Sequence, residues 1–445
     1  MAQSVAIWID GERLTARHRY TAYIVFEVAL GWSVHWPADE SDWAQSKGLK
    51  VCYGGKCRPD LGPAWIPSAG LLAGELLTHP GTEMWSNAEG PGVPGAGRLP
   101  FGVRNEDSGR TDADWWSWVF WMATRIEERN ASRDAFGRFC AASSMAYREG
   151  WLGRPEVEYR VRAWAKSLGC NPAPREYAVQ ATIDVDSAFA YKHRSPVRLV
   201  GACIKDAIRA DFKRLRARWN VLANGESDPY ATYDWLEDVH RRHGLRARYF
   251  LLLADRGTFD RPVDWQQPGM QALIQRLMKT ADVGLHPGVA AHDAADVQKM
   301  KEEGRRFERL TGTAVTHTRQ HYLLQRFPSS WQRLESLGVA HDHSLGYADA
   351  IGFRAGLSRS FCAFDLSRNE RMNLVLHPVA AMDATLNRYL HLSPDEALDA
   401  LEQLAREVKA VEGTLTLLWH NETVAELNEW VGWRAVYEQA FERVC

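Results

Sequence analysis

At 445 residues the chain is too long for one ordinary hydrophobic core, so two domains are the natural expectation. Its composition is that of a soluble globular protein, with 45% hydrophobic and 25% charged residues and a formal net charge of −2. This near-neutral balance, without an evident basic stripe or tail, gives no electrostatic reason to expect nucleic acid as a partner.

The seven cysteines are odd in number and include no C-x-x-C pair, which argues against a disulfide framework or a structural zinc site and favours a reducing compartment. The first ten residues lack the basic and apolar regions of a secretion signal. Residues 20–36 are apolar, but they include Glu27 and are fewer than a membrane span needs, so they predict a buried helix. We therefore expect a cytoplasmic protein with no membrane span.

Residues 1–172 alternate short apolar runs with loops, which predicts a small α/β domain. Residues 51–53 and 64–67 look like strands, and the Gly/Pro-rich stretch 90–102 must be a loop. Residues 114–128 predict a strongly apolar helix that ends in charge. The charged residues at and beyond that end are more typical of a structural ion-pair network than of a catalytic site: Arg125, Glu127, Glu128, Asp134 and Arg138.

A turn-rich break at residues 169–175 marks the predicted domain boundary, and the second domain covers 173–445. Its predicted strands are 177–184, 248–254, 281–285, 313–317, 351–354, 373–377 and 414–419. Its predicted helices are 197–220, 231–243, 269–279, 293–310, 328–337 and 394–411. Such a series of β-α repeats predicts a parallel barrel or a doubly wound sheet, with the active site at the carboxyl ends of the strands.

Two acidic residues end the first predicted strand of this domain. Asp184 and Asp186 point the same way, because successive side chains of a strand alternate between its faces. Two neighbouring carboxylates at the end of a buried strand stay ionised only if a positive group lies between them, usually a metal ion or a cationic substrate group. The alternative is a helix-capping acid followed by a loop acid.

Histidines follow several other predicted strands. His286 ends a strand before a Pro/Gly turn, and imidazole with carboxylate is typical of a site for zinc or a similar divalent ion whose open position activates water. His321 directly follows another strand, and we favour it over His292 as a further ligand. His341 and His343 also resemble a ligand set, although alternating histidines are more typical of an exposed turn.

Arg354 ends a strand-like run between two glycines that would let a substrate approach closely. It could pair with Asp184 and hold it as a carboxylate, or it could form a structural ion pair. His420 ends the last strand and is a candidate general acid, although a lone histidine there is usually structural. Trp419 could face a sugar, and Arg319 is a second candidate substrate contact.

In their order along the chain, these residues resemble the polysaccharide deacetylases of carbohydrate esterase family 4, also called the NodB-homology domain. The resemblance covers roughly 176–430 and is strongest at Thr182-Ile-Asp-Val-Asp186, Gly284-Leu-His-Pro287, Gly352-Phe-Arg-Ala355 and Leu418-Trp-His420. It implies an α/β fold, a distorted (β/α)7-type barrel, preceded here by a smaller α/β domain. The whole chain looks like a long bacterial subgroup of these proteins with an extra N-terminal domain.

The same resemblance implies a role for each residue. Asp184 would be the base that deprotonates metal-bound water, and Arg354 would orient that base. Asp186 would bind the metal together with His286. His420 would protonate the leaving amine.

Two positions differ from the family pattern: Val185 separates the two acids, and Ala290 stands where the usual His-x-x-x-His zinc pair has its second histidine. With Asp186, His286 and His321 as ligands, the expected cofactor is a divalent metal ion, and zinc is the metal that we favour. We expect a metal-dependent hydrolase that removes N-acetyl groups from a sugar in a glycan or glycan precursor. The alternatives are a catalytically inactive deacetylase-like glycan-binding or scaffold protein, and another hydrolase of C–N bonds, such as one that acts on a cyclic amide.

Overall fold

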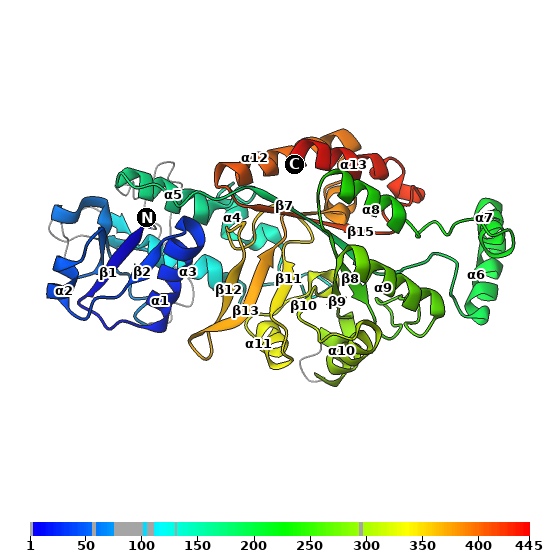
Figure 1. The fold of residues 1–445 in the computed structure, drawn as a ribbon, viewed down its shortest axis with the longest axis horizontal. Helices are drawn as coiled ribbons and strands as arrows, with labels where there is room; N and C mark the ends of the chain where they lie inside the picture. The colour runs from blue at the N-terminus through cyan, green and yellow to red at the C-terminus, as the bar shows by residue number, and fades with distance from the viewer. Residues whose placement is uncertain (1–2, 56–58, 75–100, 105–110, 130, 293–296) are drawn as a thin grey trace.

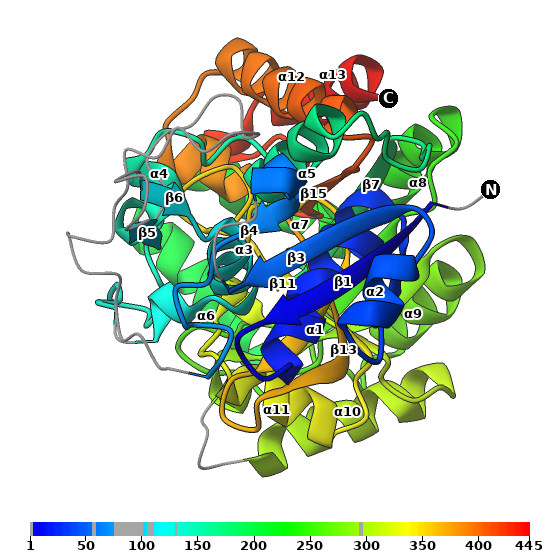
Figure 2. The ribbon, with the colours of Figure 1, turned by 90° about the vertical axis from the view of Figure 1, so that its left-hand side faces the viewer.

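The computed structural model describes residues 3–55, 59–74, 101–104, 111–129, 131–292 and 297–445. Two main sheets follow one another along the longest axis of the molecule, the smaller sheet at the N-terminal end (Figure 1). Figure 2 looks onto that end, where β1 and β3 lie in front of the larger sheet.

The smaller sheet is parallel and has the order β2-β1-β3-β4. Ala6 and Cys52 pack with Trp43 on one of its faces, and Val5 and Ile7 join the main core on the other, so the sheet is covered on both sides. Its strands are β1 (Ser4–Asp10), β2 (Ser33–His35), β3 (Leu49–Gly54) and β4 (Trp65–Ile66). Around it are the hairpin β5 (Gly102–Arg104) and β6 (Thr111–Ala113), and the helices α1 (Ala16–Ala22), η1 (Tyr23–Leu30), α2 (Glu40–Gln45), α3 (Trp115–Thr124), η4 (Ile126–Glu128), α4 (Met145–Arg148) and α5 (Glu156–Ser167).

The larger sheet has the order β12-β13-β11-β10-β9-β8-β7-β15-β14, and only β12 runs antiparallel to its neighbour. It curls into an open barrel with β12 and β14 at its edges (Figure 1). The predicted fold class, a distorted (β/α)7-type barrel preceded by a smaller α/β domain, is therefore confirmed. The strands are β7 (Ala178–Val185), β8 (Arg248–Leu252), β9 (Asp282–His286), β10 (His317–Thr318), β11 (His341–Leu345), β12 (Phe361–Asp365), β13 (Glu370–Pro378), β14 (Ala381–Met382) and β15 (Thr414–His420).

Helices follow these strands on the outside of the barrel, and one pair leaves it. The pair α6 (Pro196–Ile208) and α7 (Phe212–Ala223) projects from the end opposite the small sheet (Figure 1). The others are α8 (Tyr233–Arg242), α9 (Pro268–Thr280), α10 (Val297–Thr311), α11 (Ser329–Ser336), α12 (Pro394–Ala410) and α13 (Trp433–Val444). Of the helices in the described ranges, none combines the length and apolarity needed to cross a bilayer.

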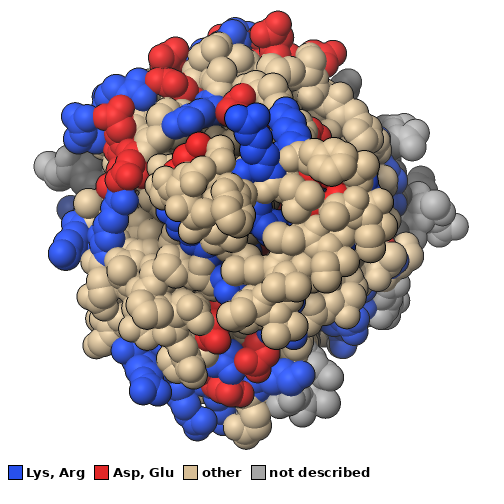
Figure 3. All heavy atoms as spheres, turned by 90° about the vertical axis from the view of Figure 1, so that its right-hand side faces the viewer, with Lys and Arg blue, Asp and Glu red and all other residues tan. Residues whose placement is uncertain are grey.

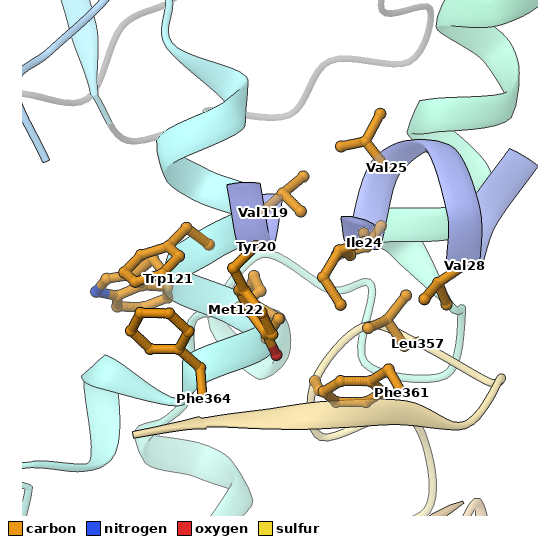
Figure 4. Packing of buried hydrophobic residues seen from close by; sticks show 14 of the residues in the cluster. Tyr20, Ile24, Val25, Val28, Val119, Trp121, Met122, Leu357, Phe361 and Phe364 are labelled. Atoms are coloured by element: carbon orange, nitrogen blue, oxygen red, sulfur yellow. The ribbon is translucent and has the colours of Figure 1, made fainter. Parts of the chain in front are cut away.

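One hydrophobic core joins the two sheets, because it contains residues of the N-terminal helices together with residues of α11, β11, β12 and β13. The rings of Tyr20 and Phe364 are 4.8 Å apart, and the Tyr20 hydroxyl donates to the carbonyl of Cys362 at 2.8 Å. Figure 4 shows Tyr20, Trp121 and Phe364 packed together beside Phe361. The first and last thirds of the chain therefore bury their apolar side chains in a common interior.

Several element predictions need correction. The predicted helix 197–220 is two helices, because Asp211 accepts a hydrogen bond from the backbone N–H of Arg214 and starts α7. The predicted strand 351–354 is wrong: Gly352 has a φ of 129°, and a Cβ there would lie 2.2 Å from the carbonyl of Leu152. Conversely, the turn expected around His341 is the largely buried strand β11. The predicted loop 90–102 lies outside the described residues as far as position 100.

Candidate functional site

The two acids lie where β7 ends, between β15 and β8. Asp184 is in register with Phe250 of β8 and with His420 of β15. Both carboxylates approach Nε2 of His286, which is 3.7 Å from Oδ2 of Asp184 and 3.2 Å from Oδ1 of Asp186. The prediction that they point to the same side is confirmed.

Asp186, His286 and His321 form a compact group in which one donor atom from each residue lies within 4.8 Å of the others. Nε2 of His321 is 3.3 Å from Oδ2 of Asp186, whereas His286 approaches Oδ1. Asp186 directly follows β7, His286 ends β9, and His321 begins the short helix η7 (His321–Leu323). The three residues that the sequence predicted as metal ligands therefore lie together in the structure.

The second ring nitrogen of each histidine is fixed by a neighbour. Nδ1 of His286 lies 2.5 Å from the carbonyl oxygen of Arg319. Because a carbonyl can only accept, Nδ1 carries the proton and Nε2 of the neutral ring keeps its lone pair. Nδ1 of His321 lies 2.7 Å from Oδ1 of Asp260. Burial opposes the charge of His321, but Asp186 and Asp260 raise its pKa to about 9, so its ring would release a proton on binding a metal ion.

These residues fit a divalent metal ion. Oδ1 of Asp186 and Nε2 of His286 are buried, lie 3.2 Å apart and have no hydrogen-bond partner among the described residues. A carboxylate with two imidazoles is a common donor set for zinc, and a carboxylate behind one imidazole is the usual outer support. His292, the alternative ligand, is not part of this group; burial lowers its pKa to about 3.

Arg319, and not Arg354, holds Asp184 in place. Its Nη1 atom donates to Oδ1 of Asp184 at 3.1 Å and to the hydroxyl of Thr182 at 2.8 Å. The guanidinium also lies over the ring of Phe250 and is fully buried. The prediction that Arg319 contacts substrate is therefore wrong, because its side chain is fully buried and does not line the cleft.

Arg354 instead connects the barrel to the N-terminal domain. Its Nε and Nη2 atoms donate to the two carboxylate oxygens of Glu128 at 2.8 and 2.5 Å. Burial opposes ionisation of Glu128, but Arg354 and Arg125 lower its pKa below the ordinary value. The pairing of Arg354 with Asp184 is thus a wrong prediction, whereas the structural ion-pair network expected at Arg125 and Glu128 is present.

His420 also approaches Asp186, with Nε2 at 3.8 Å from Oδ2, the oxygen that contacts His321. Asp383 accepts hydrogen bonds from Nδ1 and from the backbone N–H of His420, both at 2.8 Å. Burial disfavours the charged ring, but Asp383 first and then Asp186 raise its pKa to about 10. His420 therefore holds a proton at neutral pH.

Trp419 does not share this environment. It is 1% exposed and packs edge-to-face on Tyr437 of α13, because neighbouring residues on β15 point to opposite faces. The prediction that Trp419 contacts substrate is wrong for that reason.

Four histidines form a separate cluster on β10, β11 and β13, and His341 and His343 belong to it. Nδ1 of His317 is 3.0 Å from Nε2 of His343, and Nδ1 of His341 is 3.0 Å from Nε2 of His377. The rings of His317 and His341 stack, as do those of His343 and His377. Burial, with the nearby Arg248, lowers the pKa of His317 to about 3, so these rings are neutral and joined in pairs.

Asp184, Asp186, His286, His321 and His420 line a cleft of about 1230 Å³, whereas Arg319, Arg354 and Trp419 do not. Basic side chains line much of the remaining wall: Arg138, Arg194, Arg198, Lys205, Arg209, Lys213, Arg214, Arg218, Arg256, Arg261 and Arg388. The site is therefore a group of acids and imidazoles at the bottom of a basic cleft.

Asp260 and Asp383 are the site residues that the sequence analysis missed. Asp383 follows the apolar run 379–382, which is the same strand-then-acid pattern that identified Asp184. Asp260 lies in an irregular loop after β8 and carries no periodic signal.

Comparison with known proteins gives a family model for the first part of the chain and only low similarity for the rest. Residues 7–170 match a family of unknown function, DUF7033. No curated protein matches the sequence.

Several solved structures are similar over about three fifths of the chain. A protein assigned as a polysaccharide deacetylase from Mycobacterium smegmatis is 12% identical, with a TM-score of 0.41 over 62% of this chain and 85% of that one. The chitin deacetylase of Colletotrichum lindemuthianum is 13% identical, with a TM-score of 0.32 over 60% and 82%. A CE4 family pseudoenzyme from Bacillus anthracis is 10% identical, with a TM-score of 0.32 over 61% and 62%. Similarity at this level assigns no activity, so the function must be inferred from the chain's own site.

Proposed function

We propose that this protein is a metal-dependent hydrolase that removes N-acetyl groups from a sugar in a glycan or glycan precursor. The observation that carries the proposal is the arrangement around Asp186. Nε2 of His286 and Nε2 of His321 lie within 3.3 Å of its two carboxylate oxygens, and the protonated ring of His420 lies 3.8 Å from one of them. The base candidate Asp184 lies beside His286.

The metal would be held by Asp186, His286 and His321. A divalent ion bound there supplies Lewis acidity, which activates water and polarises the amide carbonyl. Zinc suits the two imidazoles and one carboxylate. The chain's own contribution is to orient these donors. The backbone carbonyl of Arg319 accepts from Nδ1 of His286, and the carboxylate of Asp260 accepts from Nδ1 of His321.

Asp184 is the proposed general base. Oδ1 of Asp184 accepts a hydrogen bond from Arg319. The other oxygen, Oδ2, lies toward the imidazole of His286 and is free to accept a proton from water. Because Arg319 is buried and bonded to Thr182 as well, the carboxylate is held in one orientation.

His420 is the proposed general acid. An amine is a poor leaving group unless it receives a proton, and Nε2 of His420 carries one on the cleft side. Asp383 fixes the ring and keeps it charged. The proposed base and acid thus line the same cleft as the candidate metal ligands.

Metal content and acetate release test the proposal together. Purified protein loaded with Zn²⁺ should retain about one ion per chain after dialysis and should release acetate from N-acetylhexosamine oligomers. The Asp184→Asn variant serves as the inactive control. Retained metal without acetate release would favour a hydrolase of another C–N bond, and loss of the metal would favour an inactive glycan-binding protein.

A further inference from the structure

Two helices between β7 and β8 form the hairpin that projects from the barrel. Only Asp206 of α6 is buried, and only Arg218 and Val221 of α7. The buried ion pair between Asp206 and Arg218, at 2.7 Å, holds the helices together. The guanidinium of Arg218 also lies 4.7 Å from the ring of Tyr191, next to the cleft. The hairpin is therefore held as a unit, with most of its side chains uncovered.

Each helix of the hairpin exposes large apolar side chains. Those of α6 recur every three or four residues and so share one face: Val197, Val200, Ile204 and Ile208. Those of α7 are Phe212, Trp219 and Leu222. The exposed fraction is 82% at Val197, 80% at Ile208 and 67% at Trp219, so nothing in the described part of the chain covers them.

The hairpin is also strongly basic. Residues 194–223 contain eight Lys and Arg and two Asp, although the whole chain has a net charge of −2. The expectation that the chain has no basic stripe is wrong for this segment. Asp206 is buried against Arg218, and Asp211 caps α7, so the two acids are already engaged. Figure 3 faces this end and shows basic side chains beside a broad uncharged surface.

We propose that the α6–α7 hairpin docks the protein on an anionic lipid bilayer. Exposed Val, Ile, Phe and Trp side chains flanked by Lys and Arg are typical of helices that lie in the membrane interface. Their apolar side chains enter the headgroup region, and each basic residue near an anionic surface strengthens binding by about fivefold. The cleft that Asp184 lines also extends to Lys205 and Lys213, so docking brings the mouth of the cleft to the bilayer surface.

A protein partner or a second copy fits this surface less well. Stable protein interfaces typically take about 20–30 residues a side, and their centres are depleted in lysine. The hairpin offers seven large apolar side chains with Lys205 and Lys213 on the same helices.

Vesicle sedimentation tests the proposal with the full-length protein. The wild type should sediment with vesicles of phosphatidylcholine containing 30% phosphatidylglycerol, and should stay in the supernatant with phosphatidylcholine alone or in 0.5 M NaCl. Two variants, Ile204→Glu/Ile208→Glu and Lys213→Glu/Arg216→Glu, should each lower the vesicle partition coefficient at least tenfold. All four side chains are exposed, so the fold should survive, which circular dichroism verifies.

The matched control is Lys299→Glu/Lys301→Glu, which changes the net charge equally at two exposed positions of α10. It should bind vesicles as the wild type does. Equal loss in the control, or wild-type binding by both hairpin variants, would overturn the proposal. A lipid-independent dimer that Ile204→Glu/Ile208→Glu dissociates in sedimentation velocity, without vesicle binding, would overturn it in favour of a second copy.

Discussion

Asp383 contacts His420 twice: one carboxylate oxygen accepts from ring Nδ1 and the other from the backbone N–H, both at 2.8 Å. This fixes the ring between Asp383 and Asp186 and raises the pKa of His420 to about 10. Because the raised pKa keeps the ring protonated below that pH, activity that needs the acid should persist at neutral pH and fall on the alkaline side.

Asp383→Asn should therefore move the alkaline limb of the kcat/KM profile to lower pH, because an amide no longer stabilises the charged ring. The acidic limb should stay in place. If the alkaline limb of the variant is unchanged, a group other than His420 sets that limb.

His420→Ala should slow hydrolysis of an N-acetyl amide by about 10²–10⁴-fold. Turnover of an activated acetyl ester should fall much less, because its leaving group needs no proton. The side chain borders the cleft, so the variant should fold. Equal losses on amide and ester would point to a structural or ligand role for His420.

Asp184→Asn should keep the metal and lower acetate release by about 10²–10⁴-fold, because the amide cannot act as base. Asp186→Asn should lose the metal. If elemental analysis shows the opposite pattern, the two acids have exchanged roles.

His321→Ala should strip most of the metal, whereas His292→Ala should retain it. Asp260→Asn should weaken metal affinity by about 10–100-fold, because Asp260 holds Nδ1 of His321 and orients the ring. Metal content per folded chain, with zinc titrated in, measures all three. Full retention in His321→Ala would rule out this ligand set.

The histidine cluster predicts a pH dependence of stability. The pKa of His317 and that of His377 are both lowered to about 3, chiefly by burial, so the unfolded chain binds protons more readily than the folded one between pH 3 and 6.5. Stability should therefore fall as pH drops below about 6.5. Tm should fall less steeply from pH 7 to 5 in His317→Gln/His377→Gln than in the wild type. Parallel slopes would contradict this account.

The sequence was sufficient to predict the α/β barrel and the grouping of Asp184, Asp186, His286 and His321. Each of these residues is at or just after a strand, and parallel strands bring their carboxyl ends to one edge. The positions of these four residues at the ends of predicted parallel strands were therefore enough to place them together, without knowledge of long-range contacts.

The wrong predictions concern partners that chain order does not specify. Arg354 ends one predicted strand and Arg319 closely follows another. Only the fold shows that Arg354 pairs with Glu128 and Arg319 with Asp184. Trp419 is different, because strand alternation already implied that it and His420 cannot face the same side. β11 was missed because its histidines do not look like an apolar strand.

The shared core has a consequence for synthesis on the ribosome. The N-terminal residues, including Tyr20 and Trp121, leave the ribosome long before Phe361 and Phe364, which complete their packing. These aromatic side chains of the first domain therefore stay exposed until more than three quarters of the chain has been made. We expect the nascent protein to depend on chaperones during that interval, and a fragment that stops before β12 to aggregate.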